Sequence, residues 1–196
     1  MLTLNVQYQK KYSRVELFLR SFLGGIFIVA PHFFILFFVI IWAKLLWVYA
    51  TFYILLKGEY PSYSRKYLIG VLGWLSRIHL SVYNLVDGYP AFGINAEAKN
   101  VTIKYNGPNQ INRLSVLFRF LFSGIIILPH LIIWIFRNLI SCLLTFLAFW
   151  AVIFTGKFPK QWHDFNVATL RWLIRIIGFQ LYLEEEYPPF NGKPNE

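Results

Sequence analysis

Two histidines that each follow a proline, His32 and His130, are the residues whose type and spacing could bind a cofactor. Both lie inside long apolar stretches, at the same place in two similar halves of the chain. Two imidazoles that face one another can ligate a b-type haem from opposite sides. A structural interpretation is also open, because proline frees the carbonyl four residues back and a polar neighbour can satisfy it. The pair therefore predicts either a haem b site, or a helix kink or a headgroup contact.

Six arginines that recur in both halves form the second candidate site. Guanidinium groups offer planar, bidentate donors to phosphate, and anionic headgroups lie at the depth expected for these side chains. We therefore predict that they bind lipid. The alternative is that they only set the membrane topology and make cation–π contacts with Trp74 and Trp172. The six residues are Arg14, Arg20, Arg77, Arg113, Arg119 and Arg175.

No catalytic group and no metal site stand out. The chain has no Ser/His/Asp trio, no HExxH motif, no glycine-rich phosphate loop and no paired carboxylates with a catalytic spacing. Its single Cys142 excludes a disulfide within one chain, and the run Glu184 to Glu186 is typical of a solvated strand end. The expectation is a protein that is not an enzyme and has no cofactor, with haem b as the alternative.

The distribution of charge predicts a membrane protein. Hydrophobic residues make up 57% of the 196 residues and charged residues only 14%, against about 25% in a soluble domain. Residues 21–56 contain one charge, Lys44, and residues 120–156 contain one, Arg137. About 20 apolar residues span a bilayer, so each stretch is long enough for two short helices, or for one long kinked helix with a re-entrant tail. We expect helical hairpins that turn within 37–46 and 135–144.

The basic residues predict the orientation. Most of the lysines and arginines lie outside the two apolar stretches, and the net charge is +10. By the positive-inside rule the N-terminal arm, the middle segment and the C-terminal segment lie on the cytoplasmic side. We expect a multi-pass protein of the bacterial inner membrane with both termini in the cytoplasm. Topology explains the basic excess, so nucleic acid is not an expected partner.

The elements that must position these residues occur twice. The same special residues recur about 98 positions later, which indicates one structural unit made twice. Each unit should contain a short strand, a membrane hairpin, an interfacial amphipathic helix and a second short strand. The recurring pairs are Pro31-His32 with Pro129-His130, Gly58 and Pro61 with Gly156 and Pro159, Trp74 and Arg77 with Trp172 and Arg175, and Tyr89–Phe92 with Tyr187–Phe190.

The predicted fold class is a mainly α membrane protein with two tandem repeats and a small cytoplasmic β-sheet. Alternating, β-prone residues place the strands at 4–8, 81–85, 101–105 and 179–183. The expected boundaries are a first repeat at 1–93 (hairpin about 18–57, amphipathic helix about 61–82), a linker at 94–100, a second repeat at 101–190 (hairpin about 117–156, amphipathic helix about 159–178) and a disordered tail at 191–196.

This doubled pattern resembles a family of bacterial integral membrane proteins known only as a domain of unknown function. The resemblance supports a membrane protein with a repeat and implies no chemistry. The first copy departs from the pattern, with Ala91 where the second has Pro189. The elements that carry the resemblance are Arg14 and Arg20, Pro31, Gly58-x-x-Pro61, Trp74-x-x-Arg77 and Tyr187-Pro188-Pro189-Phe190.

Three functions from different classes follow. The first is a scaffold or accessory subunit that packs against other membrane subunits or a second copy, and whose basic residues bind anionic lipid. The second is a lipid transport component with a headgroup site between the repeats. The third is an electron carrier with a haem held by His32 and His130.

Overall fold

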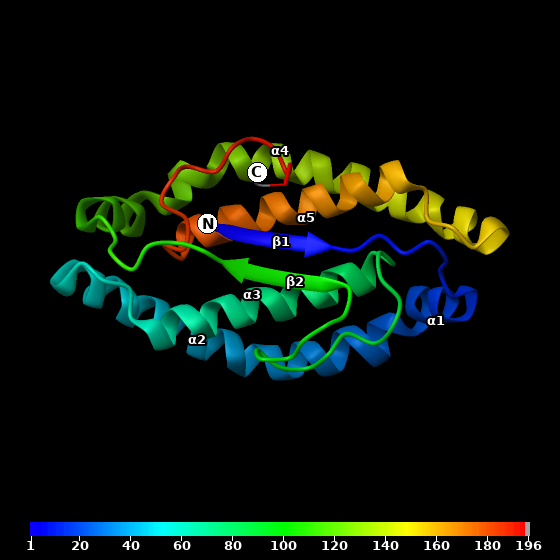
Figure 1. The fold of residues 1–196 in the computed structure, drawn as a ribbon, viewed down its shortest axis with the longest axis horizontal. Helices are drawn as coiled ribbons and strands as arrows, with labels where there is room; N and C mark the ends of the chain where they lie inside the picture. Colours follow the sequence, from blue (N-terminus) through cyan, green and yellow to red (C-terminus); the bar gives the residue numbers. More distant parts are fainter. Residues whose placement is uncertain (195–196) are drawn as a thin grey trace.

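The computed structural model describes residues 1–194 and is mainly helical, with one small sheet (Figure 1). The mainly helical fold class is therefore confirmed. In chain order the elements are β1 (Leu2–Val6), α1 (Arg14–Gly24), the π-helical turn η1 (Gly25–Val29), α2 (Ala30–Lys57), α3 (Ser62–Val82), β2 (Val101–Tyr105), α4 (Arg113–Thr155) and α5 (Lys160–Gln180).

Each apolar stretch forms one long helix, so the predicted hairpins are wrong. The segments α1, η1 and α2 follow one another without a break from Arg14 to Lys57, and α4 is a single helix of 43 residues. Neither predicted turn region contains a glycine or a proline, and an uninterrupted run of helix-forming residues continues as helix. Both helices are long and apolar enough to span a membrane.

Local signals fix both ends of the long helices. The side chains of Ser13 and Asn112 accept hydrogen bonds from the first free backbone amides, at Glu16 and at Leu114. At the other ends Gly58 (φ 76°) and Gly156 (φ 70°) adopt the left-handed conformation that glycine tolerates best. The predicted ends of the two apolar stretches, at about 57 and 156, agree with these helix ends.

The sheet has two antiparallel strands among the described residues. Leu2 pairs with Tyr105, Leu4 with Ile103 and Val6 with Val101. The strands predicted at 81–85 and 179–183 are wrong, because these residues end α3 and α5 and then turn. Asn84 (φ 56°) and Tyr182 (φ 61°), at equivalent positions, make these turns in the left-handed region.

The helices α3 and α5 are the centre of the molecule. Figure 1 shows α4, α5, β1, β2, α3 and α2 in that order across the view, with the long helices on the outside. The predicted helices at 61–82 and 159–178 exist as α3 and α5, and both are largely buried within the protein. Their apolar faces pack against the long helices, and their other faces lie under the sheet and the loops, so Trp74 and Trp172 are each 2% exposed.

The C-terminal tail is ordered over the part that the structure describes. Arg171 donates to the Gly192 carbonyl (2.7 Å), and Arg175 donates to the carbonyls of Asn191 (3.5 Å) and Lys193 (2.6 Å). The prediction of disorder from residue 191 is therefore wrong for 191–194, and residues 195–196 lie outside the described residues.

Candidate functional site

Residues that are far apart in the sequence meet around His32. Trp74 of α3 donates its indole N–H to His32 Nδ1 at 2.8 Å. The Phe92 ring stacks on the imidazole, with centroids 3.8 Å apart and planes 3° apart, and Tyr89 stacks at 5.4 Å. His32 is fully buried as a result. The repeated motifs of the first half thus build one aromatic cluster, which joins α2, α3 and the segment after α3.

The same contacts recur around His130. Trp172 Nε1 donates to His130 Nδ1 at 3.1 Å. Phe190 stacks on the imidazole with centroids 4.0 Å apart, and Tyr187 lies at 4.7 Å. His130 is also fully buried. The sequence analysis singled out every one of these residues, although it assigned only the histidines to a site.

The hydrogen bond from tryptophan fixes the tautomer of both histidines. A Nδ1 atom that accepts a hydrogen bond must carry a lone pair there, so the single N–H of the neutral imidazole is on Nε2. The Nε2 atoms of His32 and His130 are buried and have no hydrogen-bond partner among the described residues. Metal ligation needs the lone pair on the free nitrogen, which these Nε2 atoms lack. Each imidazole is also enclosed in its own cluster, so the geometry does not favour a shared haem.

A tyrosine hydroxyl donates to a helix carbonyl just before each proline–histidine pair, and in the first half this is the carbonyl that the proline frees. Pro31 cannot donate to the Phe27 carbonyl four residues back, and the Tyr89 hydroxyl donates to that carbonyl at 2.8 Å. In the second half the Tyr187 hydroxyl donates to the Ile126 carbonyl at 2.9 Å, three residues before Pro129, and not to the Ile125 carbonyl that this proline frees. The predicted structural role of the proline therefore agrees with the contacts of the first half only.

Arg77 and Arg175 hold the segments that carry these phenylalanines. Arg77 donates to the carbonyls of Ala91 (3.2 Å) and Gly93 (2.5 Å), on either side of Phe92. Arg175 binds the residues that follow Phe190 in the same way. The two arginines are 7% and 5% exposed, and burial lowers the pKa of both guanidinium groups. Both side chains bind protein carbonyls, which corrects the prediction that they face lipid headgroups.

Arg20 and Arg119 are also occupied by the protein. Arg20 donates to Asp87 (2.7 Å), Glu16 (3.2 Å) and Asn84 (3.0 Å). Arg119 is 4% exposed and donates to three backbone carbonyls at the end of α5 and beyond, those of Phe179, Glu184 and Glu185. A headgroup role is therefore wrong for these two residues as well.

Arg14 and Arg113 keep the exposure that a lipid contact needs. Both are exposed at the first residue of a long helix. Arg14 donates to the Phe154 carbonyl at the end of α4 (3.3 Å), and Arg113 lies against Gly58 at the end of α2. Each end of the molecule therefore has an exposed arginine beside an exposed lysine, Lys157 or Lys57.

The other two charges of the apolar stretches lie on helix sides. Lys44 is exposed on α2. Arg137 is partly buried, donates to the Thr169 hydroxyl (2.9 Å) and stacks over the Phe165 ring at 4.1 Å. Neither residue marks a turn, contrary to the expectation.

The long helices expose an unusually large apolar surface. Almost all of the exposed large hydrophobic side chains of the described residues belong to α1, η1, α2 and α4, and only Tyr63 and Val82 belong to α3. They run from Val15 to Leu56 and from Leu114 to Phe154. A soluble monomer rarely exposes an apolar patch larger than a few hundred Å². This surface is consistent with a membrane protein.

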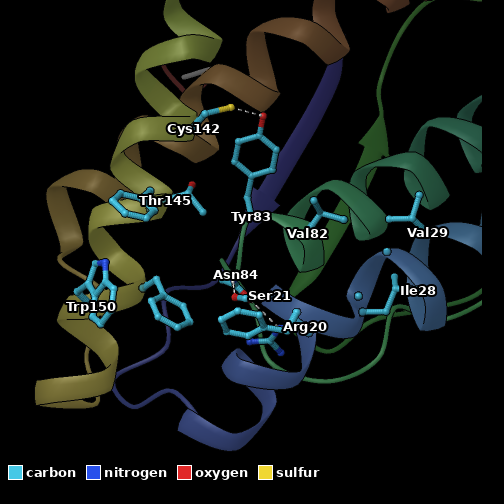
Figure 2. A pocket seen from close by; sticks show the side chains of 15 residues that line it. Arg20, Ser21, Ile28, Val29, Val82, Tyr83, Asn84, Cys142, Thr145 and Trp150 are labelled. Atoms are coloured by element: carbon cyan, nitrogen blue, oxygen red, sulfur yellow. Dashed lines mark hydrogen bonds between the residues drawn. The ribbon is translucent and has the colours of Figure 1, made fainter.

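A cavity of about 640 Å³ lies between α1, η1, the end of α3, and α4. Figure 2 shows Thr145 and Trp150 of α4 on one side, Ile28 and Val29 on the other, and polar Asn84 nearby. The Tyr83 hydroxyl contacts Cys142 Sγ at 3.4 Å and donates to Asn138 (2.9 Å). This cavity was not predicted from the sequence, although several of the residues that line it are smaller than their counterparts in the other half of the chain, for example Thr145 against Trp47.

The comparison with family models matched the second half of the chain. Residues 113–191 match a domain of unknown function (DUF4389). The match runs from the start of α4 to one residue past Phe190, and so covers most of the second predicted repeat at 101–190. It includes His130, Trp172 and Arg175. Neither the curated proteins nor the solved structures gave a match.

Proposed function

We propose that this protein is a non-enzymatic scaffold or accessory subunit of the bacterial inner membrane, built from two tandem repeats. Its two long helices lie within the cytoplasmic leaflet, parallel to the membrane plane. The observation that carries this proposal is the exposed apolar surface, which continues along the whole length of both helices. Both termini stay on the cytoplasmic side, as the basic residues predict.

Length argues for this orientation. Helices of 44 and 43 residues are about 66 and 65 Å long at 1.5 Å per residue. The hydrocarbon core is about 30 Å thick, so an upright helix would carry roughly half of its apolar side chains into water. A helix that lies in the plane of the leaflet keeps all of them in lipid.

The sheet argues for the same orientation. It lies alongside the middle of the long helices (Figure 1), so upright helices would place it at bilayer depth. Asn5, Thr102 and Lys104 of the strands are exposed. Open sheet edges and charges do not face hydrocarbon, because their polar groups would lack partners there. With the long axis in the membrane plane, the sheet faces the cytoplasm.

Exposed basic groups at both ends of the molecule suit anionic headgroups. Arg14 with Lys157, and Arg113 with Lys57, lie where the long helices begin and end. Each basic residue near an anionic surface contributes about 1 kcal/mol. Lys44 can extend its charge from the flat helix to the same headgroup layer, because long basic side chains snorkel.

Depth measurements at three positions along the first long helix test the orientation. Single cysteines at Phe18, Phe34 and Phe52, in a Cys142→Ser background, receive a fluorophore in vesicles of phosphatidylethanolamine and phosphatidylglycerol. All three native side chains are more than half exposed. With lipids brominated at graded chain positions, we expect the same shallow depth at all three sites. A label at Lys104 should stay in water and serves as the control.

Two other results would refute this function. A label at the bilayer centre at position 34, with labels near opposite surfaces at 18 and 52, would show that the helix spans the membrane. Labels that stay in water at all three positions would show that the apolar surface binds protein.

The lipid transport alternative draws support from the cavity, which lies between the two repeats.

A further inference from the structure

We propose that the cavity between α1 and α4 binds one chain of a lipid whose head is uncharged and carries hydroxyl or ester groups. The inference rests on the membrane location proposed above. Its volume of about 640 Å³ lies within the range of about 300–1,000 Å³ typical of small-molecule sites. The site includes residues of both halves of the chain, with Ser21 and Asn84 from the first and Thr145 from the second.

The equivalent place in the other half shows that the cavity is specific to one side. Thr145 corresponds to Trp47 and Asn84 to Tyr182 at a spacing of 98 residues. Ser21 corresponds to Phe120 at a spacing of 99, as the neighbouring Arg20 does to Arg119. These three aromatic rings pack together: Trp47 lies 6.2 Å from Tyr182 and 5.6 Å from Phe120, measured between centroids. The cavity beside Trp47 is correspondingly smaller, at about 360 Å³.

The cavity between α1 and α4 therefore has smaller, polar residues at the positions that three packed aromatic residues occupy in the other half. When nothing fills this open pocket, the apolar side chains in its wall lack packing partners on one side, which is unfavourable. Polar groups in its wall add a further cost when they lack partners. An occupant that contacts the apolar walls and bonds the polar groups offsets both costs.

The polar groups can donate to a ligand. The Ser21 hydroxyl oxygen accepts from Asn84 Nδ2 at 3.2 Å, and the Thr145 hydroxyl oxygen accepts from Asn166 Nδ2 at 3.1 Å. Neither hydroxyl proton has an acceptor among the described residues, so both can donate to an ester carbonyl or a hydroxyl. Facing them, Phe22, Phe146 and Phe149 supply an apolar wall for an acyl chain.

The charges around the cavity exclude an anionic head. Arg20 is the only charged residue in the lining, and two carboxylates, Glu16 and Asp87, already bind it. The group of three carries a net negative charge. A bound phosphate would be repelled by this net negative charge and would find no unpaired basic side chain in the lining to pair with. Burial of an unpaired charge is strongly unfavourable. An uncharged head avoids this cost.

Two filling variants test the site. Gly25→Phe adds a ring from η1, where a Cβ would meet no atom within 4 Å, and it removes no side-chain hydrogen bond. Thr145→Trp introduces the residue found at the equivalent position of the other half, Trp47. Leu139→Trp adds the same bulk on an exposed residue of α4, outside the cavity, and is the matched control. Near-ultraviolet circular dichroism checks that each variant folds.

The probe is monoolein, titrated into the full chain in mild detergent and followed by native mass spectrometry. We expect one monoolein per chain, binding weakened at least tenfold in both filling variants, and unchanged binding in Leu139→Trp. Oleoyl lysophosphatidylglycerol, which adds an anionic phosphoglycerol group to the same oleoylglycerol, should bind at least tenfold more weakly than monoolein.

Three results would overturn the inference: no saturable binding of monoolein, equal binding in a folded filling variant, or tighter binding of the lysophosphatidylglycerol. Because the titration is done in detergent, it does not depend on the depth measurements. The cavity can thus fail as a lipid site while the in-plane orientation stands, and the reverse also holds.

Discussion

Replacing either Arg77 or Arg175 by Met should lower the free energy of unfolding by about 3 kcal/mol and leave membrane insertion unchanged. Each guanidinium donates to two backbone carbonyls. A hydrogen bond to a charged group contributes about 1.5–3 kcal/mol, and these partly buried carbonyls would lose their arginine partner. Methionine keeps the length of the side chain, so lost bonding is the main effect.

Thermal unfolding in mild detergent measures this change. At about 2–4 °C per kcal/mol for a chain of this size, each variant should lose about 6–12 °C in Tm. Arg14→Met is the matched control, because Arg14 is exposed and makes one bond of 3.3 Å, and it should lose no more than about 2 °C. Equal losses in all three variants would contradict the structural role assigned to Arg77 and Arg175.

These arginines illustrate what the sequence could predict. Their recurrence, three residues after Trp74 and Trp172, correctly marked them as special residues. Their partners are backbone carbonyls of the segments after α3 and α5, and a sequence pattern carries no sign of such partners. Arginine near an apolar stretch is typical of both headgroup contact and internal capping, so residue type alone did not separate the two roles.

For the long helices, too, the sequence predicted some features correctly and others wrongly. Gly58 and Gly156 gave reliable helix ends, because a left-handed C-cap has a strong residue preference. The hairpin prediction was wrong because it was based on membrane topology and not on local turn signals. An even number of membrane crossings was needed to place all the basic segments on one side of the membrane. In the proposed orientation, a helix that lies in one leaflet keeps these segments on that side without any crossing.

The residues that the two halves share could not reveal the cavity. The cavity forms where the halves differ, because Thr145 stands at the position equivalent to Trp47, and Asn84 at the position equivalent to Tyr182. The aromatic clusters around His32 and His130 are, by contrast, present in both halves.

Replacing Trp172 by Ala should cost about 3–5 kcal/mol, the usual range for a large buried aromatic residue. Trp172 is 2% exposed, packs on Phe190 and donates to His130. Trp42→Ala is the control, because Trp42 is 46% exposed on α2 and should change stability by about 0.5 kcal/mol or less in detergent. Equal losses in the two variants would show that the cluster does not stabilise the fold.

A double-mutant cycle separates the hydrogen bond from the packing. Trp172→Phe removes the N–H and leaves His130 Nδ1 buried without a donor, at a cost of about 1–3 kcal/mol beyond the lost volume. His130→Leu in the Trp172→Phe background removes both polar partners, so part of the stability should return. If His130→Leu instead destabilises Trp172→Phe as much as it destabilises the unaltered protein, the bond adds no coupling energy. His130 would then be held by stacking on Phe190 alone, and the tautomer argument against haem ligation would fail with it.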